Sequence, residues 1–153
     1  MEAREVLARL EPLGPLVATG SYVSGLMVSR EIDVVMDGGP ADVVPLFARA
    51  VEIPGLTGFA YDRAGDDIKV TLTVGAWRVL LSLRPDGGPD PAGWHRDLAA
   101  RLTGEEREAI LAIKRMWHER PEYPGADAVC TAVLEDGVRT AVEFGVWLRS
   151  PSR

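Results

Sequence analysis

The chain has 153 residues, with 17 lysines and arginines against 23 aspartates and glutamates, so its formal net charge is −6. Hydrophobic residues make up 46% of the sequence and charged residues 26%, which is ordinary for a globular protein and excludes collagen-like, low-complexity and extensively disordered chains. A chain of this length buries enough surface to fold without disulfide or metal staples. Sequence-independent binding to a phosphate backbone needs clustered cations, so the acidic balance predicts no nucleic-acid partner.

The cysteine content and the lack of long apolar runs point to a cytoplasmic location. Cys130 is the single cysteine and cannot form an internal disulfide, which fits a reducing compartment. Residues 1–14 alternate charged and apolar side chains and lack the apolar stretch of a secretion signal. No run approaches the roughly 18 apolar residues of a membrane span, so we expect no membrane partner.

Residues 2–11 have the apolar spacing of an amphipathic helix. Residues 16–19 form a short apolar run, closed by a glycine, that predicts a buried strand. Residues 21–29 are expected to form a loop or short helix, and residues 31–36 a second strand.

A helix is predicted over residues 40–52, because a proline followed by an aspartate suits a helix start. The side chains expected to point inward from this helix are Val43, Leu46, Phe47 and Ala50. Residues 56–61 and 68–74 predict a hairpin, followed by a strand over residues 77–83. The last two strands alternate apolar and polar residues, which is typical of strands with one buried face.

Residues 84–91 contain three prolines and two glycines, which predicts a domain boundary here. The expected parts are an αβ core over residues 1–88 and a helical C-terminal segment over residues 89–153, packed on the core. Within that segment, residues 103–106 (Thr-Gly-Glu-Glu) form a capping box that opens a helix. Asp127 is expected to cap the helix that follows.

The residues most indicative of chemistry lie at the ends of the first two strands. Gly20 and Ser21 follow the first strand in a turn, where a missing side chain lets backbone N–H groups approach a phosphate. Glu31 and Asp33 lie two residues apart on the second strand, so both carboxylates project from one face of it. Two neighbouring carboxylates repel each other unless a cation lies between them, and hard oxygen ligands suit Mg²⁺ together with substrate phosphates.

This pattern resembles the signature of the polymerase-beta-like nucleotidyltransferase superfamily, which includes antibiotic adenylyltransferases and small bacterial nucleotidyltransferase-like proteins. The resemblance is specific over residues 19–34 and looser over the rest of the chain. It implies an α+β fold, a nucleotidyltransferase-like mixed β-sheet flanked by helices, with a C-terminal helical segment. It also implies that Gly20 and Ser21 hold the triphosphate and that Glu31 and Asp33 are the catalytic residues and the magnesium ligands.

The sequence departs from the family pattern at the third carboxylate, which the family carries on a later strand. The polar face of residues 77–83 offers only Arg78, Leu80 and Ser82, with Leu80 where the carboxylate is expected. Three aspartates near the hairpin are possible substitutes: Asp62, Asp66 and Asp67. Lys69 is a candidate phosphate ligand, although an exposed polar strand face explains it equally well.

Two functions follow from this reading. The first is Mg²⁺-dependent transfer of a nucleoside monophosphate from a nucleoside triphosphate to a hydroxyl of a small molecule or protein. The second is a catalytically silent nucleotide-binding or protein-interaction module that lacks the third carboxylate.

Overall fold

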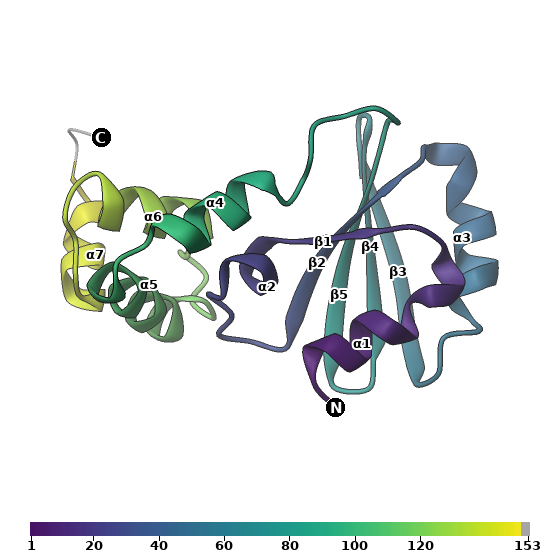
Figure 1. Cartoon of the computed structure of the whole chain (residues 1–153), viewed down its shortest axis with the longest axis horizontal. Coiled ribbons are helices and arrows are strands. Elements are labelled where there is room, and N and C mark those ends of the chain that lie inside the picture. The colour runs from purple at the N-terminus through teal and green to yellow at the C-terminus, as the bar shows by residue number, and fades with distance from the viewer. Residues whose placement is uncertain (151–153) are drawn as a thin grey trace. The chain divides into compact units, whose positions relative to one another are not determined.

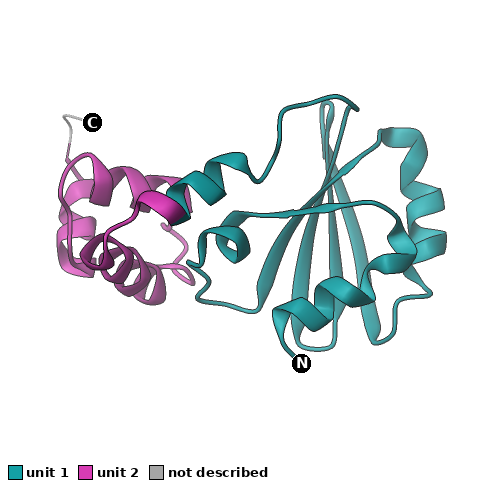
Figure 2. Cartoon of the chain, viewed as in Figure 1, with its two compact units in different colours: residues 1–99 teal, residues 100–153 magenta. Residues whose placement is uncertain are grey.

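The computed structural model describes residues 1–150 and divides into two compact units, residues 1–99 and residues 100–153 (Figure 2). The helix that links them, α4 (Gly93–Arg101), lies across this division. No helix in the described part of the chain is long and apolar enough to cross a membrane.

A five-stranded mixed sheet is the framework of the first unit (Figure 1). Its strands are β1 (Val17–Thr19), β2 (Glu31–Asp37), β3 (Leu56–Ala64), β4 (Asp67–Val74) and β5 (Trp77–Arg84). Their order across the sheet is β1-β2-β5-β4-β3, and only the β2–β5 pair is parallel. The expected mixed sheet with flanking helices is therefore confirmed.

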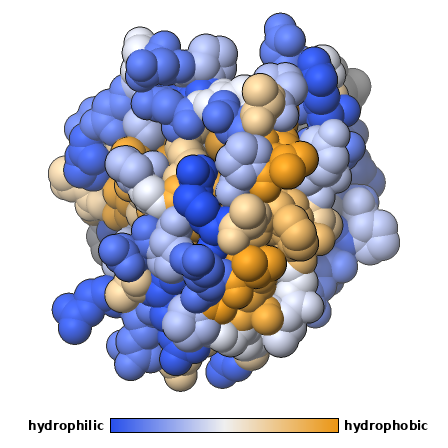
Figure 3. Space-filling model, turned by 90° about the vertical axis from the view of Figure 1, so that its right-hand side faces the viewer, coloured by the Kyte–Doolittle hydropathy of each residue, from blue (hydrophilic) through white to orange (hydrophobic). Residues whose placement is uncertain are grey.

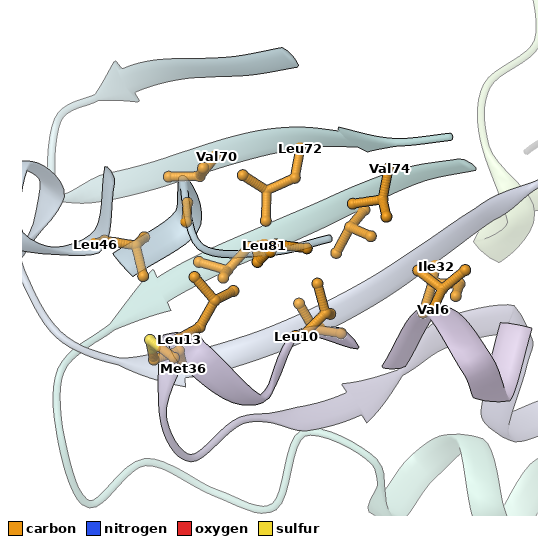
Figure 4. Packing of buried hydrophobic residues seen from close by; sticks show 14 of the residues in the cluster. Val6, Leu10, Leu13, Ile32, Met36, Leu46, Val70, Leu72, Val74 and Leu81 are labelled. Atoms are coloured by element: carbon orange, nitrogen blue, oxygen red, sulfur yellow. The ribbon is translucent and has the colours of Figure 1, made fainter. Parts of the chain in front are cut away.

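Helices cover one face of this sheet. They are α1 (Ala3–Arg9), the 3₁₀ turns η1 (Glu11–Leu13) and η2 (Pro40–Asp42), and α3 (Val43–Ala50). Figure 4 shows buried side chains from α1, η1 and α3 packed against apolar side chains of the strands. A further short helix, α2 (Gly20–Ser24), connects β1 towards β2.

Alternation along the strands separates a core face from an open face. The core face of β5 is formed by Trp77, Val79, Leu81 and Leu83, all buried. On the other face the side chains are half-buried or exposed, and we call this the open face. Its residues on the three central strands are Glu31, Asp33, Val35, Asp37, Lys69, Thr71, Thr73, Arg78, Leu80, Ser82 and Arg84.

The expected inward orientation of Phe47 on α3 is wrong. Leu46 and Ala50 are buried, but Phe47 is 48% exposed and contacts Phe59 of β3 edge to face, with ring centroids 5.0 Å apart. Val44 and Val51 are also exposed. Figure 3 views the molecule from the side of α3 and shows apolar residues gathered there. The rotation of α3 about its own axis, which local periodicity does not specify, places Phe47 on the outer side of the helix.

The second unit contains three helices, α5 (Gly104–Trp117), α6 (Ala126–Leu134) and α7 (Ala141–Leu148). The predicted capping box is present, since Thr103 Oγ1 accepts from the Glu106 N–H at 3.1 Å and Glu106 Oε1 accepts from the Thr103 N–H at 2.9 Å. α6 begins two residues earlier than expected, with Gly125 rather than Asp127 at its N-cap.

The two faces of β5 give a direct test of the open face. Leu81→Ala removes a fully buried side chain, so we expect a loss of about 2–5 kcal/mol in the free energy of unfolding. Leu80→Ala changes the same residue type one position earlier, on the open face, and we expect a loss well below that of Leu81→Ala. Urea unfolding of both variants measures the difference, and equal losses would show that this face is closed.

A buried phenol in the second unit has an unusual environment. The Tyr123 Oη atom is buried and makes no hydrogen bond with any described residue. Burial, with smaller contributions from Cys130 and Asp127, raises the pKa of Tyr123 from 10.0 to about 12. The folded state therefore holds this proton more tightly than the unfolded state, and its contribution to stability is lost as the pH rises from 10 towards 12.

Tyr123→Phe removes the hydroxyl that has no partner. We expect it to leave stability unchanged or raise it by up to about 1 kcal/mol at neutral pH, because no hydrogen bond is lost. Above pH 10 the advantage of Tyr123→Phe should grow, since only the parent chain can release this proton on unfolding. Urea unfolding at several pH values checks both points, and a clear loss of stability at neutral pH would contradict them.

Candidate functional site

Gly20 lies directly against Asp33. Thr19, the last residue of β1, pairs with Asp33 across the antiparallel β1–β2 ladder, and the chain turns at the next residue. Gly20 has a φ of +63°, and a Cβ atom built on it would lie 2.4 Å from Asp33 Oδ2. Only glycine tolerates both this backbone conformation and this approach. The structure therefore brings together the turn and one of the two predicted acids.

Local hydrogen bonds hold the turn in place. Ser24, which is buried, donates from Oγ to the Gly20 carbonyl at 3.3 Å, and the Leu26 N–H donates to the Ser21 carbonyl at 3.0 Å. Gly25 ends α2 in the left-handed conformation. On the strand side, Thr19 Oγ1 donates to the carbonyl of Pro91 at 2.6 Å, a contact between positions 72 residues apart.

Glu31 shares the open face with Asp33, as predicted. The intervening Ile32 is fully buried on the core face. Glu31 also has a partner that sequence patterns did not indicate, because Glu31 pairs with Arg78 in the parallel β2–β5 ladder. Arg78 Nη1 lies 3.0 Å from Glu31 Oε2. The signal that would have found this ion pair is the β2–β5 register, which depends on residues far apart in the chain.

The place expected for a third carboxylate is occupied by Leu80. Leu80 is the β5 residue that pairs with Asp33, so it lies beside this acid on the open face. No group of three or more histidine, cysteine, aspartate or glutamate side chains in residues 1–150 is arranged to hold a metal ion. The substitutes considered from the sequence do not fill the gap: Asp62 belongs to β3, which β4 and β5 separate from β2, and Asp66 and Asp67 lie at the far hairpin turn.

Lys69 lies on the open face but not beside Asp33. Its Nζ donates to Ser82 Oγ on β5 at 2.8 Å, across a β4–β5 pair. β5 separates β4 from β2, so Lys69 and Asp33 stand on strands about 10 Å apart. A role for Lys69 in binding nucleotide stays a prediction.

The donor set fits one Mg²⁺ ion. Magnesium in nucleotide sites is bound through one or two carboxylates together with substrate phosphates, and Glu31 and Asp33 supply two carboxylates on one strand. Such a site leaves no protein carboxylate for a second ion, because the neighbouring residue on β5 is Leu80. The arrangement offers two carboxylates for one cation, beside a turn whose first residue, Gly20, has no side chain.

No protein-family model matches the chain, and no curated protein matches it by sequence. Solved structures do. The polymerase core of TRAMP, an RNA surveillance complex, aligns with 97% of this chain at 18% identity and a TM-score of 0.61. The Cid1 poly(U) polymerase aligns with 72% at 14% identity and a TM-score of 0.53. The fold is that of the nucleotidyltransferases. The chain spans less than half the length of either protein, 47% and 37% respectively.

These neighbours correct one expectation. The acidic net charge led us to exclude nucleic acid as a partner, and this exclusion is wrong, because proteins with this fold include an RNA surveillance polymerase and a poly(U) polymerase. The physical error lies in using a whole-chain charge of −6. Charge acts locally, and the open face carries Lys69, Arg78 and Arg84 alongside Glu31, Asp33 and Asp37, so the whole-chain value does not describe it.

The contact between Gly20 and Asp33 can be tested with a matched pair of glycines. Gly20→Ala places a methyl group on the Asp33 carboxylate and also strains the backbone, so we expect a loss of stability well above the roughly 1–2 kcal/mol of left-handed strain alone. Gly65→Ala has nearly the same φ, +64°, with no atom near the new methyl, and should show the strain alone. Chemical unfolding compares them, and equal losses would contradict the close approach.

Proposed function

We propose that the chain binds a nucleoside triphosphate with one Mg²⁺ beside Asp33 and transfers its nucleoside monophosphate to a hydroxyl acceptor, with pyrophosphate as the leaving group. The observation that carries this proposal is the close approach of Gly20 to Asp33, which leaves no room for a methyl group between Gly20 and the Asp33 carboxylate. This approach sets a turn whose first residue has no side chain next to a carboxylate on a strand, in a nucleotidyltransferase fold.

Each residue has a defined part in this proposal. The backbone at Gly20 and Ser21 binds the phosphates, because no side chain at position 20 keeps them away. Asp33 and Glu31 hold the magnesium ion, which when bound offsets the charge of the phosphates during in-line attack. Asp33 is fixed by pairing on both sides, with Thr19 and with Leu80, so the strand and not a loop sets its position.

The acceptor is a hydroxyl group of a molecule that the sequence does not identify. The resemblance noted above implies a small molecule, as in the antibiotic adenylyltransferases, or a protein. The similar solved structures are an RNA surveillance polymerase and a poly(U) polymerase, which adds RNA as an acceptor class. A cytoplasmic location, expected from the single cysteine, stays a prediction.

Leu80 favours a second candidate function, a nucleotide-binding module without turnover. A carboxylate at this position would supply a general base or a ligand for a second metal ion, and its absence removes roughly 10²–10⁴-fold in rate. The contact of Gly20 with Asp33 does not depend on position 80, so binding is expected to persist where transfer is lost.

Calorimetry with Mg-ATP, Mg-GTP and Mg-UTP tests the binding step. We expect Asp33→Asn to weaken binding by about tenfold or more, because it removes a charged metal ligand. Asp37→Asn is the matched control, since Asp37 lies on the same strand and face at its far end, near Arg84. Equal losses in the two variants, or no metal-dependent binding by the parent chain, would contradict both candidate functions.

Pyrophosphate release separates the two candidates. The assay uses RNA, aminoglycoside and protein acceptors with the parent chain, Leu80→Asp and the uncharged control Leu80→Asn. For a transferase we expect slow release by the parent and an increase of about 100-fold or more in Leu80→Asp, where a third carboxylate faces Asp33. Tight nucleotide binding without release by any of the three proteins would identify the silent module.

A further inference from the structure

The ion pair between Arg78 and Glu31 places a cation of the protein on one of the two metal ligands. Arg78 Nη1 lies 3.0 Å from Glu31 Oε2, which is hydrogen-bond distance. The pairing follows from strand register and not from a flexible approach, because Glu31 and Arg78 face each other across the β2–β5 ladder. Any divalent ion that uses Glu31 must share it with this guanidinium or displace it.

The charge of the cluster sets how strongly a free divalent ion is held. Glu31 and Asp33 carry two negative charges, Arg78 one positive charge, and Leu80 none, so the cluster has a net charge of −1. A positive charge about 5 Å from a divalent ion in water-like surroundings weakens binding of that ion by roughly tenfold. The protein alone is therefore expected to bind Mg²⁺ or Mn²⁺ weakly.

A polyphosphate reverses this balance. The Arg78 side chain is 60% exposed, so it can turn to a ligand on the open face without creating a cavity in the core. Its planar guanidinium suits two phosphate oxygens at once, whereas its ion pair with Glu31 is a contact of Nη1 with Oε2. Once Arg78 binds phosphate, both oxygens of Glu31 become available to the metal ion.

We propose that Arg78 competes with the divalent cation for Glu31, and that a polyphosphate, by taking over the guanidinium, opens Glu31 to the metal. Metal and polyphosphate then bind with positive coupling through Arg78. The coupling is reciprocal, so each ligand raises the affinity for the other. This inference deepens the proposed function and rests on it, since it assigns the regulation of the same site.

Binding of Mn²⁺ alone, followed by the electron paramagnetic resonance of the free ion, tests the competition. Arg78→Met removes the guanidinium and keeps the apolar stem, and we expect it to bind Mn²⁺ about tenfold more tightly than the parent chain. Arg30→Met is the matched control, because Arg30 precedes Glu31, is exposed and takes part in no ion pair within residues 1–150. Adding Glu31→Gln to Arg78→Met should abolish the gain.

Inorganic tripolyphosphate, titrated in the presence of a chelator, tests the other half. Without metal, Arg78→Met should bind tripolyphosphate several-fold more weakly than the parent chain, while Arg30→Met changes little. The same substitution is thus expected to tighten metal binding and weaken polyphosphate binding. A local loss of structure would weaken both, so the opposite signs identify the competition.

The outcomes separate this inference from the proposed function. If Arg78→Met and Arg30→Met change Mn²⁺ affinity equally, or if Arg78→Met gains nothing while Asp33→Asn still weakens nucleotide-dependent metal binding, the inference is overturned and the proposed function stands. If no variant binds Mn²⁺ with or without nucleotide, both are overturned. A gain confined to Arg78→Met and cancelled by Glu31→Gln supports the inference.

Discussion

The parallel register between β2 and β5 decides what this protein's open face contains. One alignment of two strands sets Glu31 opposite Arg78 and Asp33 opposite Leu80. A slip by one residue would move every side chain of a strand to the other face, and the buried Ile32, Val79 and Leu81 forbid that slip. Apolar packing on the core face therefore fixes which charged side chains lie beside one another on the open face.

The site is a reduced form of what the resemblance to the nucleotidyltransferase superfamily implies. The turn at Gly20 and the acid at position 33 are in contact, which is the arrangement that the proposed phosphate and cation site requires. On the neighbouring strand, the chain carries Leu80 where a third carboxylate was expected, and Arg78 beside Glu31. In the proposed function, binding and chemistry thus depend on different residues, so retention of binding says nothing about the rate of transfer.

Much of the fold could be predicted from the sequence, because its signals are local. The alternation along residues 68–74 and 77–83 specified which side chains of β4 and β5 are buried, and the Thr103 capping box located the start of α5. The pairing of Glu31 with Arg78 could not be predicted, since it joins strands 47 positions apart through a crossover that no local pattern encodes. Phe47 was misplaced for a similar reason: its exposure depends on how α3 is rotated over β3.

The hydrogen bond from Thr19 to the Pro91 carbonyl shows that the proline-rich segment also supports β1, besides connecting β5 to α4. It fastens the end of that segment to the residue just before the turn, on the strand that pairs with Asp33. A chimaera that replaces the helical C-terminal part therefore has a preferred fusion point. Joined after residue 92, the fusion keeps the anchoring carbonyl; joined before Pro91, it releases the strand end and leaves the turn held from one side only.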